Sequence, residues 1–302
     1  MSNRILLIYN PRAGKGRFLT ALPMVIDLFT KAGYQVEAYP TQSPGDAVRK
    51  VSTLKDHYDM LVPAGGDGTL DEIVTGLIRS GLDIPVGYIP VGSTNDYANS
   101  LGLSSNIVQA VGDIIEGKPC GVDAGVFNKD HVFVYVAAFG AFTEVAYETN
   151  QDMKKALGHV AYIIEATRRL GDLKSYTLRV STEDFLTQHD YIYGMVTNST
   201  SVGGIKNITG TEVRLDDGLF EVTLIHNPKN ILEMQEIVGC LLTQNHDTDL
   251  IDYFKTDDLK LTSAQEIPWT FDGEYGGAFS EVHIQNRRQA IRMVVDPSKA
   301  KL

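Results

Sequence analysis

Short apolar runs alternate with helical patterns along the first 120 or so residues, and this alternation restricts the fold more than any other feature of the chain. Strands are expected at residues 4–9, 35–39, 60–63 and 86–90, and helices at residues 18–32, 44–54, 70–80 and 107–116. A strand followed by a helix, repeated in this way, is typical of parallel α/β units. Glycine-containing turns follow three of the strands, at the edge where open α/β sheets bind their ligands.

After about Val122 the pattern changes to β-rich runs, at residues 131–138, 175–181, 191–197, 219–225, 258–262 and 282–285. Two helical patterns interrupt these runs, at residues 153–170 and 230–242. Such a succession is typical of a sandwich or barrel. We therefore predict an α/β protein with two domains, residues 1–122 and residues 123–302. The second domain is β-rich, and the last strand could return to the first domain.

Charge and cysteine content exclude several classes of protein. The chain has 27 Lys and Arg against 38 Asp and Glu, a net charge of -11, which works against bulk attraction to nucleic acids or anionic membranes. Any contact with phosphate or lipid must therefore be local. Cys120 and Cys240 form no Cys-x-x-Cys pattern, so we expect a reducing compartment and neither a disulfide framework nor a zinc knuckle. The sequence shows no secretion signal and no apolar stretch near the roughly 20 residues that cross a bilayer, so a cytoplasmic protein is expected.

The strongest chemical signal is the turn Gly65-Gly66-Asp67-Gly68-Thr69, which follows a strand and opens a helix. Glycines lack Cβ atoms, so backbone N–H groups can approach an anionic ligand closely, and the helix N-terminus adds a favourable dipole. Asp67 is well placed to meet a cation, and beside phosphates that cation would be Mg²⁺. The alternative for Thr69 and Glu72 is a capping box, with Thr69 as the N-cap and Glu72 reaching back to it.

Two further turns follow neighbouring strands. Pro90-Val91-Gly92-Ser93-Thr94-Asn95-Asp96 offers hydroxyl, amide and acidic groups, although polar turn residues usually satisfy their own backbone. Asn10-Pro11-Arg12-Ala13-Gly14-Lys15-Gly16 is a basic loop that suits phosphates without specifying a nucleotide fold. A Walker A loop would need Gly in place of Tyr9 and Ser or Thr in place of Gly16, and a Rossmann fingerprint would need Gly in place of Leu19.

The order of these and later motifs resembles that of the diacylglycerol kinase catalytic-domain family, especially its soluble bacterial lipid kinases. The matching stretches are Asn10 to Gly14, Gly65 to Thr69, Pro90 to Asp96, Asp123-x-Gly125, Leu215-Asp216-Asp217-Gly218-Leu219 and Asp272-Gly273-Glu274. Motifs in the same order along nearly the whole chain are far more specific than any one of them. The resemblance implies an N-terminal α/β domain like that of phosphofructokinases and NAD kinases, which binds nucleotide. It also implies a C-terminal β-sandwich that carries the lipid site.

An activity and its cofactors follow from the same resemblance. It implies that the chain uses ATP and Mg²⁺ to phosphorylate a lipid hydroxyl, in particular diacylglycerol to phosphatidic acid, with glycerol-phosphate lipids or sphingoid bases as other substrates. The partner would be a lipid at a membrane surface, met transiently from the cytoplasm. No nucleic acid is expected, and a homodimer is left open. Two rivals remain: an NAD kinase, whose Asn-Glu pair is absent from this chain, and a nucleotide-binding regulator without catalysis.

The resemblance also assigns residues to the nucleotide. Contacts with ATP fall on Asn10, Gly14, Thr41, Gly66, Asp67, Gly68, Thr69, Leu70, Asp71, Glu72 and Ser93. Relatives commonly carry Asn in place of Asp71 and Thr in place of Ser93. Both differences keep hydrogen-bonding capacity, but Asp71 adds negative charge beside the expected phosphates.

A structural metal site and a catalytic base complete the implied site. The backbone carbonyls of Arg214 and Leu219 and the carboxylate of Asp217 would bind Mg²⁺, a hard cation that prefers oxygen ligands. The alternative there is a plain Asp-Gly hairpin turn. Glu274 matches the family's base, a carboxylate that accepts the proton of the lipid hydroxyl as the new bond to phosphorus forms. The alternative is a second Asp-Gly turn, with Glu274 merely solvated and Asp67 acting as base or metal anchor.

The helical pattern at residues 153–170 has an apolar face with Lys154, Lys155, Arg168 and Arg169 at its ends. Such a helix could touch a membrane surface. The alternative is a helix that packs on its own domain and keeps its charged ends in water.

Overall fold

The computed structural model describes residues 3–55, 57–141, 173–203, 205–206, 213–243 and 247–298. The chain forms two compact units. The first unit comprises Met1–Ala124, Arg214–Gly218 and Arg287–Leu302, and the second comprises Gly125–Val213 and Leu219–Asn286. The sequence prediction placed the boundary after residue 122 and allowed the last strand to return to the first unit. It did not include the return of residues 214–218.

A four-stranded parallel sheet forms the centre of the first unit, in the order β2-β1-β3-β4. Its strands are β1 (Asn3–Tyr9), β2 (Tyr34–Pro40), β3 (Met60–Gly65) and β4 (Ile89–Pro90). Its helices are α1 (Arg17–Lys31), α2 (Asp46–Ser52), α3 (Asp67–Ser80), α4 (Asp96–Leu101) and α5 (Ile107–Glu116), with a short 3-10 turn η1 (Ala13–Gly16) before α1. The α/β class predicted for this half is confirmed.

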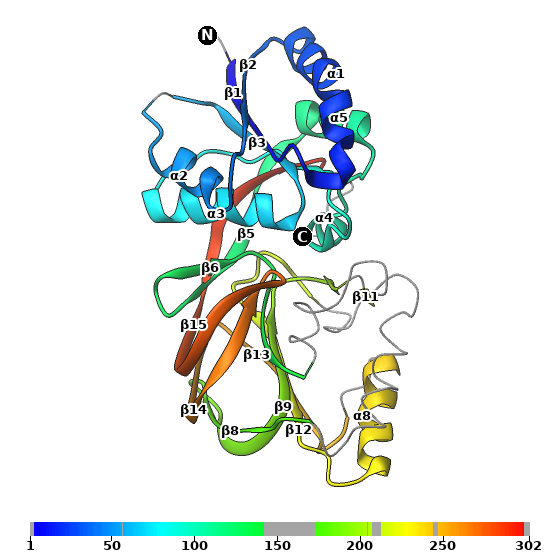
Figure 1. Ribbon diagram of the computed structural model, residues 1–302, viewed down its shortest axis with the longest axis vertical. Coiled ribbons are helices and arrows are strands. Elements are labelled where there is room, and N and C mark those ends of the chain that lie inside the picture. The colour runs from blue at the N-terminus through cyan, green and yellow to red at the C-terminus, as the bar shows by residue number, and fades with distance from the viewer. Residues whose placement is uncertain are drawn as a thin grey trace. The chain divides into compact units, whose positions relative to one another are not determined.

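Helices cover this sheet on both faces. In Figure 1, α1 and α5 lie together and away from α2 and α3. Phe29 of α1 and Val111 of α5 pack with Leu7 and Val62 of the sheet in one buried core. Residues 5–8 of β1 are completely buried, as expected for a parallel strand that is covered on both sides and therefore apolar at every position.

The end of the long strand β15 (Glu274–Val295) completes the edge of this sheet. Val86 forms isolated bridges with Leu61 on one side and Met293 on the other. The N–H of Val86 donates to the carbonyl of Arg292 at 2.8 Å, and the N–H of Val294 donates to the carbonyl of Val86 at 2.8 Å. The strand expected at residues 86–90 is thus reduced to β4 and these bridges, while Met293 is fully buried.

The second unit is built on a nine-stranded sheet, in the order β13-β12-β9-β7-β14-β15-β5-β6, with β8 paired to β14 and β9. Two of these strands, β5 and β15, extend into the first unit. Besides β15, its strands are β5 (Lys118–Phe127), β6 (His131–Phe133), β7 (Val136–Gly140), β8 (Tyr176–Ser181), β9 (Leu186–Thr197), β12 (Phe220–His226), β13 (Ile251–Thr256) and β14 (Asp258–Phe271). A small separate sheet joins β10 (Ser201–Val202) to β11 (Ile205–Lys206), and the helix expected at residues 230–242 is α8 (Ile231–Thr243). The β-rich second half is confirmed.

An aromatic core fills the second unit. β7 and β8 each pair with both β9 and β14, so the four strands close a ring of hydrogen-bonded pairs. The Trp269 ring lies 5.1 Å from that of Phe127 and 4.9 Å from that of Phe139, measured between centroids. Met234 and Ile237 of α8 belong to a second, smaller apolar cluster. Dense aromatic packing makes this unit a stiff support for the turns at its edges.

Among the helices that the structure describes, none is long and apolar enough to cross a membrane. The helical pattern at residues 153–170, with the face that could touch a membrane, lies outside the described residues.

Candidate functional site

Three glycine loops of the first unit lie against one another at the carboxyl edge of its sheet. The first glycine loop is residues 10–16 after β1, the second is residues 65–66 at the end of β3, and the third is residues 91–95 after β4. The N–H of Val91 donates to the carbonyl of Gly65 at 2.8 Å. A Cβ added to Gly92 would lie 2.6 Å from the Cα of Gly66, and one added to Gly14 would lie 2.1 Å from the carbonyl oxygen of Val91. Only residues without a side chain permit this approach.

The first glycine loop is shaped by its own polar groups. The Asn10 side-chain oxygen accepts the N–H of Arg12 at 2.9 Å, an Asx turn that starts the loop. Gly14 has a left-handed backbone, with φ of 57°. Thr41, which follows β2, donates its N–H to the carbonyl of Tyr9 at 2.9 Å and so lies beside the start of the loop. The structure therefore brings Asn10, Gly14 and Thr41 to one end of the sheet, and their contact with ATP stays a prediction.

Helix α3 begins at Asp67, immediately after Gly66, which corrects the capping-box interpretation. Thr69 lies inside the helix and is buried, and no side-chain hydrogen bond caps this end. The two carboxylate oxygens of Glu72 instead accept the N–H groups of Gly45 at 2.7 Å and Ala47 at 2.9 Å. Glu72 therefore stabilises the start of α2. The sequence pattern was misleading because it shows only partners near in sequence, whereas these partners lie 25 and 27 residues away.

Asp67 links the second and third glycine loops. Its carboxylate accepts the N–H of Asp96 at 3.0 Å and that of Tyr97 at 3.4 Å, in the first turn of α4. Burial, and then the negative charge of Asp67, raise the pKa of Tyr88 well above its ordinary value. The Tyr88 hydroxyl therefore stays protonated and donates to the carbonyl of Gly65 at 3.3 Å. Contact of Asp67 with Mg²⁺ stays a prediction.

The other predicted ATP residues differ in exposure. Leu70 is completely buried, so it could meet a ligand only through its main chain. Gly68, Asp71 and Glu72 are half-buried, and Ser93 of the third glycine loop is exposed. Exposed residues of these loops are thus Arg12 and Lys15 in the first and Ser93 and Thr94 in the third.

Residues 214–218 are held on the first unit by the buried side chain of Asp123. Its carboxylate accepts the N–H of Gly218 at 2.6 Å and that of Gln289 at 2.7 Å, and its own N–H donates to the carbonyl of Leu215 at 2.8 Å. One carboxylate thereby joins three segments that are far apart in sequence. Sequence analysis placed Asp123 in a motif without a role, because the Asp-x-Gly pattern does not show where its partners are.

The expected metal residues lie on this same stretch. Arg214 is exposed and its guanidinium contacts Asp216 at 3.3 Å, while Asp217 is half-buried and Leu219 is where the chain re-enters the second unit. One carboxylate and two carbonyls are all oxygen donors, a chemistry that fits Mg²⁺ with water completing the shell. No group of three or more His, Cys, Asp or Glu comes together in the described parts of the chain, so a metal here would depend on those carbonyls.

Glu274 follows a tight hairpin turn of the second unit. Phe271 of β14 pairs with Glu274 of β15, and the two residues between them, Asp272 and Gly273, have φ of 48° and 86°. This is the Asp-Gly hairpin geometry with two left-handed residues. Asp272 is buried, whereas Glu274 is exposed. The predicted Asp-Gly turn is present at residues 272–273. It leaves Glu274 at the start of β15, and the role of Glu274 as a base stays a prediction.

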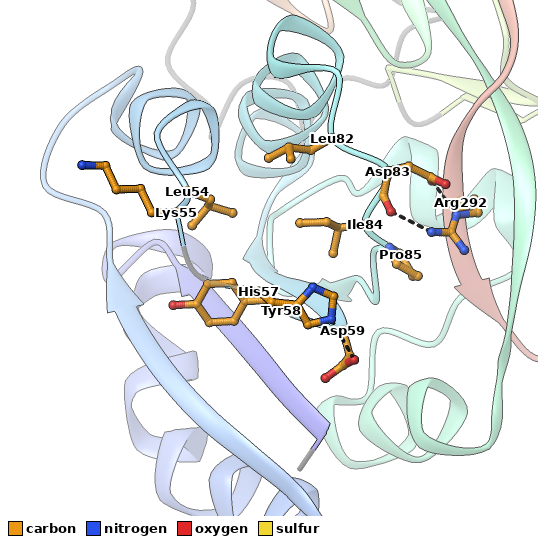
Figure 2. A pocket seen from close by; sticks show the side chains of 10 residues that line it. All are labelled: Leu54, Lys55, His57, Tyr58, Asp59, Leu82, Asp83, Ile84, Pro85 and Arg292. Atoms are coloured by element: carbon orange, nitrogen blue, oxygen red, sulfur yellow. Dashed lines mark hydrogen bonds and ion pairs between the residues drawn. The ribbon is translucent and has the colours of Figure 1, made fainter. Parts of the chain in front are cut away.

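A pocket of about 540 Å³ lies at the opposite edge of the first unit's sheet, and Figure 2 shows its lining. Its walls come from the segments that lead into β3 and β4, together with Arg292. Arg292 contacts Asp83 at 2.6 Å and the His57 ring contacts Asp59 at 3.3 Å. Most charged groups at the rim of the pocket are therefore paired with one another. The residues that line it include none of those predicted from the sequence.

Comparison with family models divides the chain in a similar way. Residues 4–127 match the model "Diacylglycerol kinase catalytic domain", and residues 136–295 match "YegS C-terminal NAD kinase beta sandwich-like domain". A diacylglycerol kinase of Staphylococcus carnosus is 34% identical over 279 residues, which cover 92% of this chain and 90% of that protein. One of Staphylococcus saprophyticus is 33% identical with the same coverage of both proteins.

Solved structures share the fold. One from Bacillus anthracis str. Sterne aligns with a TM-score of 0.84 at 22% identity and covers 98% of this chain and 96% of its own. A diacylglycerol kinase of the same organism aligns with a TM-score of 0.78 at 21% identity and covers 98% of both chains. The expected fold, an α/β domain and a β-sandwich-like domain, is confirmed by these matches.

Proposed function

The chain belongs to the diacylglycerol kinase family, and on this basis we propose that it transfers the γ-phosphate of ATP to a lipid hydroxyl, converting diacylglycerol to phosphatidic acid. The observation that carries the proposal is the meeting of the three glycine loops, where the backbone of Gly66 approaches Gly92 too closely for a side chain at Gly92. Loops of this kind present N–H groups to phosphate oxygens. A lipid acceptor follows from the family rather than from the geometry.

The nucleotide would bind at the first unit's loops. Asn10, Gly14, Thr41 and Ser93 surround this edge from β1, β2 and β4, and residues 66–72 supply the end of α3 with its positive dipole. Mg²⁺, held by Asp217 with the carbonyls of Arg214 and Leu219, would fix the loop that Asp123 already anchors. In phosphoryl transfer the protein mainly aligns the reactants and neutralises charge, and these groups supply both.

Glu274 would act as the base for the acceptor hydroxyl. As the lipid oxygen forms its bond to the γ-phosphorus, the bond from that phosphorus to ADP breaks and the hydroxyl proton passes to the Glu274 carboxylate. Asp67 is the second candidate for the base. Its carboxylate already accepts the N–H groups of Asp96 and Tyr97, which favours Glu274.

The test is Mg²⁺-dependent transfer of labelled γ-phosphate from ATP, with diacylglycerol in mixed micelles offered beside soluble NAD. Wild type is compared with Glu274→Gln and with Glu281→Gln, a matched control at an exposed glutamate of the same strand. We expect label in phosphatidic acid from wild type and Glu281→Gln, and its loss from Glu274→Gln. Label in NADP would contradict the lipid substrate, and ATP binding without transfer to any lipid would favour a regulator. An active Glu274→Gln would move the base to Asp67.

A lipid substrate also requires contact with a membrane surface, and we propose that this contact is peripheral and transient, from the cytoplasm. Sedimentation with vesicles of phosphatidylcholine, with and without diacylglycerol, measures it directly. Greater sedimentation with diacylglycerol is expected, and equal sedimentation with both vesicles would contradict recognition of that lipid in the bilayer.

A further inference from the structure

The turn before Glu274 is fastened by an unusual set of hydrogen bonds. Asp272 is 8% exposed. One of its carboxylate oxygens accepts the N–H of Val134 at 2.7 Å, and the other accepts those of Tyr135 at 3.0 Å and Val136 at 2.9 Å. Its own N–H donates to the carbonyl of Val136 at 2.9 Å. Three consecutive backbone N–H groups thus converge on one buried carboxylate, which forms a compact anion-binding arrangement.

The partners of Asp272 are themselves held firmly. Val136 opens β7 and pairs with Thr197 of β9. The carbonyl of Tyr135 accepts the N–H of Asn198 at 2.9 Å. Val134, Tyr135 and Val136 are all buried. The carboxylate therefore ties a turn at the edge of the second unit to strands in its middle.

Glu274 needs such a support because its own side chain has none in the described structure. It is exposed, and no hydrogen bond or ion pair of its carboxylate occurs within the described ranges. Its position is therefore set by its backbone, two residues beyond Asp272. Hydrogen bonds to an ionised group are about twice as strong as neutral ones, so three of them fix this backbone well.

We propose that Asp272 is a positioning residue for the base: its carboxylate holds the hairpin so that the Glu274 carboxylate keeps one position and orientation relative to the acceptor hydroxyl. This inference rests on the proposed function of Glu274. Asp272 would affect turnover through Glu274 and would not itself contact the substrate.

Asp272→Asn tests the anchor without changing the turn, because Asn-Gly suits the same left-handed pair of residues as Asp-Gly. The amide keeps one acceptor oxygen and turns an NH₂ group toward a backbone N–H, so at least one of the three hydrogen bonds is lost. A displacement of about 1 Å at a reacting group can lower the rate on the order of 100-fold. We expect kcat to fall about 10- to 100-fold while KM for ATP changes less than about twofold, since ATP binds in the first unit.

A double-mutant cycle separates positioning from a general loss of structure. If Asp272 acts through Glu274, then Asp272→Asn should lower the residual rate of Glu274→Gln by less than about twofold. If Asp272 had only a structural role, Asp272→Asn would lower the rates of wild type and of Glu274→Gln by the same factor. The matched control is Asp258→Asn, which removes the same charge at the far end of the β14–β15 ladder, and it should keep wild-type kcat.

Gly273→Ala keeps the inference testable if Asp272→Asn does not fold. The added Cβ would meet nothing nearer than the Tyr135 hydroxyl at 4.0 Å, so the change only strains a φ of 86° in the same turn. We expect a three- to tenfold fall in kcat, on the order of what a slight displacement causes, and no further fall in the Glu274→Gln background. A wild-type kcat in Asp272→Asn or, failing that, Gly273→Ala would overturn the inference. Equal losses in both backgrounds would overturn it too, whereas an active Glu274→Gln would instead overturn the proposed base.

Discussion

Replacing Gly92 by Ala should separate the second and third glycine loops. Gly92 does not have a left-handed φ, so alanine adds no backbone strain and only its methyl group matters. That methyl would lie 2.6 Å from the Cα of Gly66, whereas carbon atoms in contact normally keep about 3.5–4.0 Å. One loop must therefore retreat by about 1 Å.

The retreat should affect both stability and nucleotide binding. Forcing extra atoms into a packed region costs about 1–3 kcal/mol, and for domains of this size each kcal/mol lowers Tm by about 2–4 °C. The same movement pulls N–H groups away from the expected phosphates. We expect a lower Tm and an increase in the Kd for Mg-ATP of about tenfold or more.

Gly112→Ala is the matched control, because nothing in the described structure lies within 4 Å of its Cβ position in the middle of α5. Alanine in a helix is favoured over glycine by about 0.5–1 kcal/mol, so this variant should gain stability and bind ATP normally. Thermal unfolding and titration calorimetry measure both quantities. If Gly92→Ala matched Gly112→Ala in Tm and ATP affinity, the close approach of the loops would have no part in binding.

Two further predictions concern the start of α2. Glu72→Gln leaves one acceptor oxygen for the two N–H groups of Gly45 and Ala47, so urea unfolding should show a loss of about 1–2 kcal/mol, and an unchanged midpoint would contradict the capping role. The pKa of Asp46 is lowered in the folded protein, chiefly because its carboxylate accepts the N–H of Gln42. Ionised Asp46 therefore stabilises the fold at pH values above the ordinary carboxyl pKa of about 3.9, and this stabilisation is lost as pH falls through the lower pKa of the folded state. Asp46→Asn should therefore lose less stability than wild type between about pH 6 and about pH 3, and parallel pH profiles would refute this.

Hydrophobic periodicity was sufficient to predict most elements of the first unit and most strands of the second, but α4, β5 and β13 were missed. Every strand and helix expected before residue 117 has a counterpart, because burial on one face or both imposes a period that can be read locally. Among the elements that were predicted, the errors lie at boundaries. Helix α3 begins three residues before the expected Leu70, since the flexible Gly66 can end the strand and open the helix directly.

Side-chain partners could not be predicted in the same way. The sequence shows Glu72, Asp123 and Asp272 as acidic residues in or near glycine turns, which suggests caps, hairpins or ligand contacts. In the structure each of the three carboxylates accepts backbone N–H groups from a segment at least 25 residues away. Such partners depend on tertiary topology, and a single sequence carries no local sign of it.

The bridge between Val86 and Met293 has a consequence for how the protein can be made. The ribosome releases residues 1–124 long before it adds the strand that closes their sheet. The sheet of the first unit can therefore be completed only after the second unit has been synthesised. A fragment that stops at Ala124 would leave the N–H and carbonyl of Val86 without the bonds to Arg292 and Val294, and an open sheet edge invites pairing with another chain. The two units are therefore unsuited to separation by truncation. To isolate the first one, its gene would need to be permuted so that residues 287–298 are joined to residues 3–124 by a new linker, and residues 214–218 would have to be supplied as well.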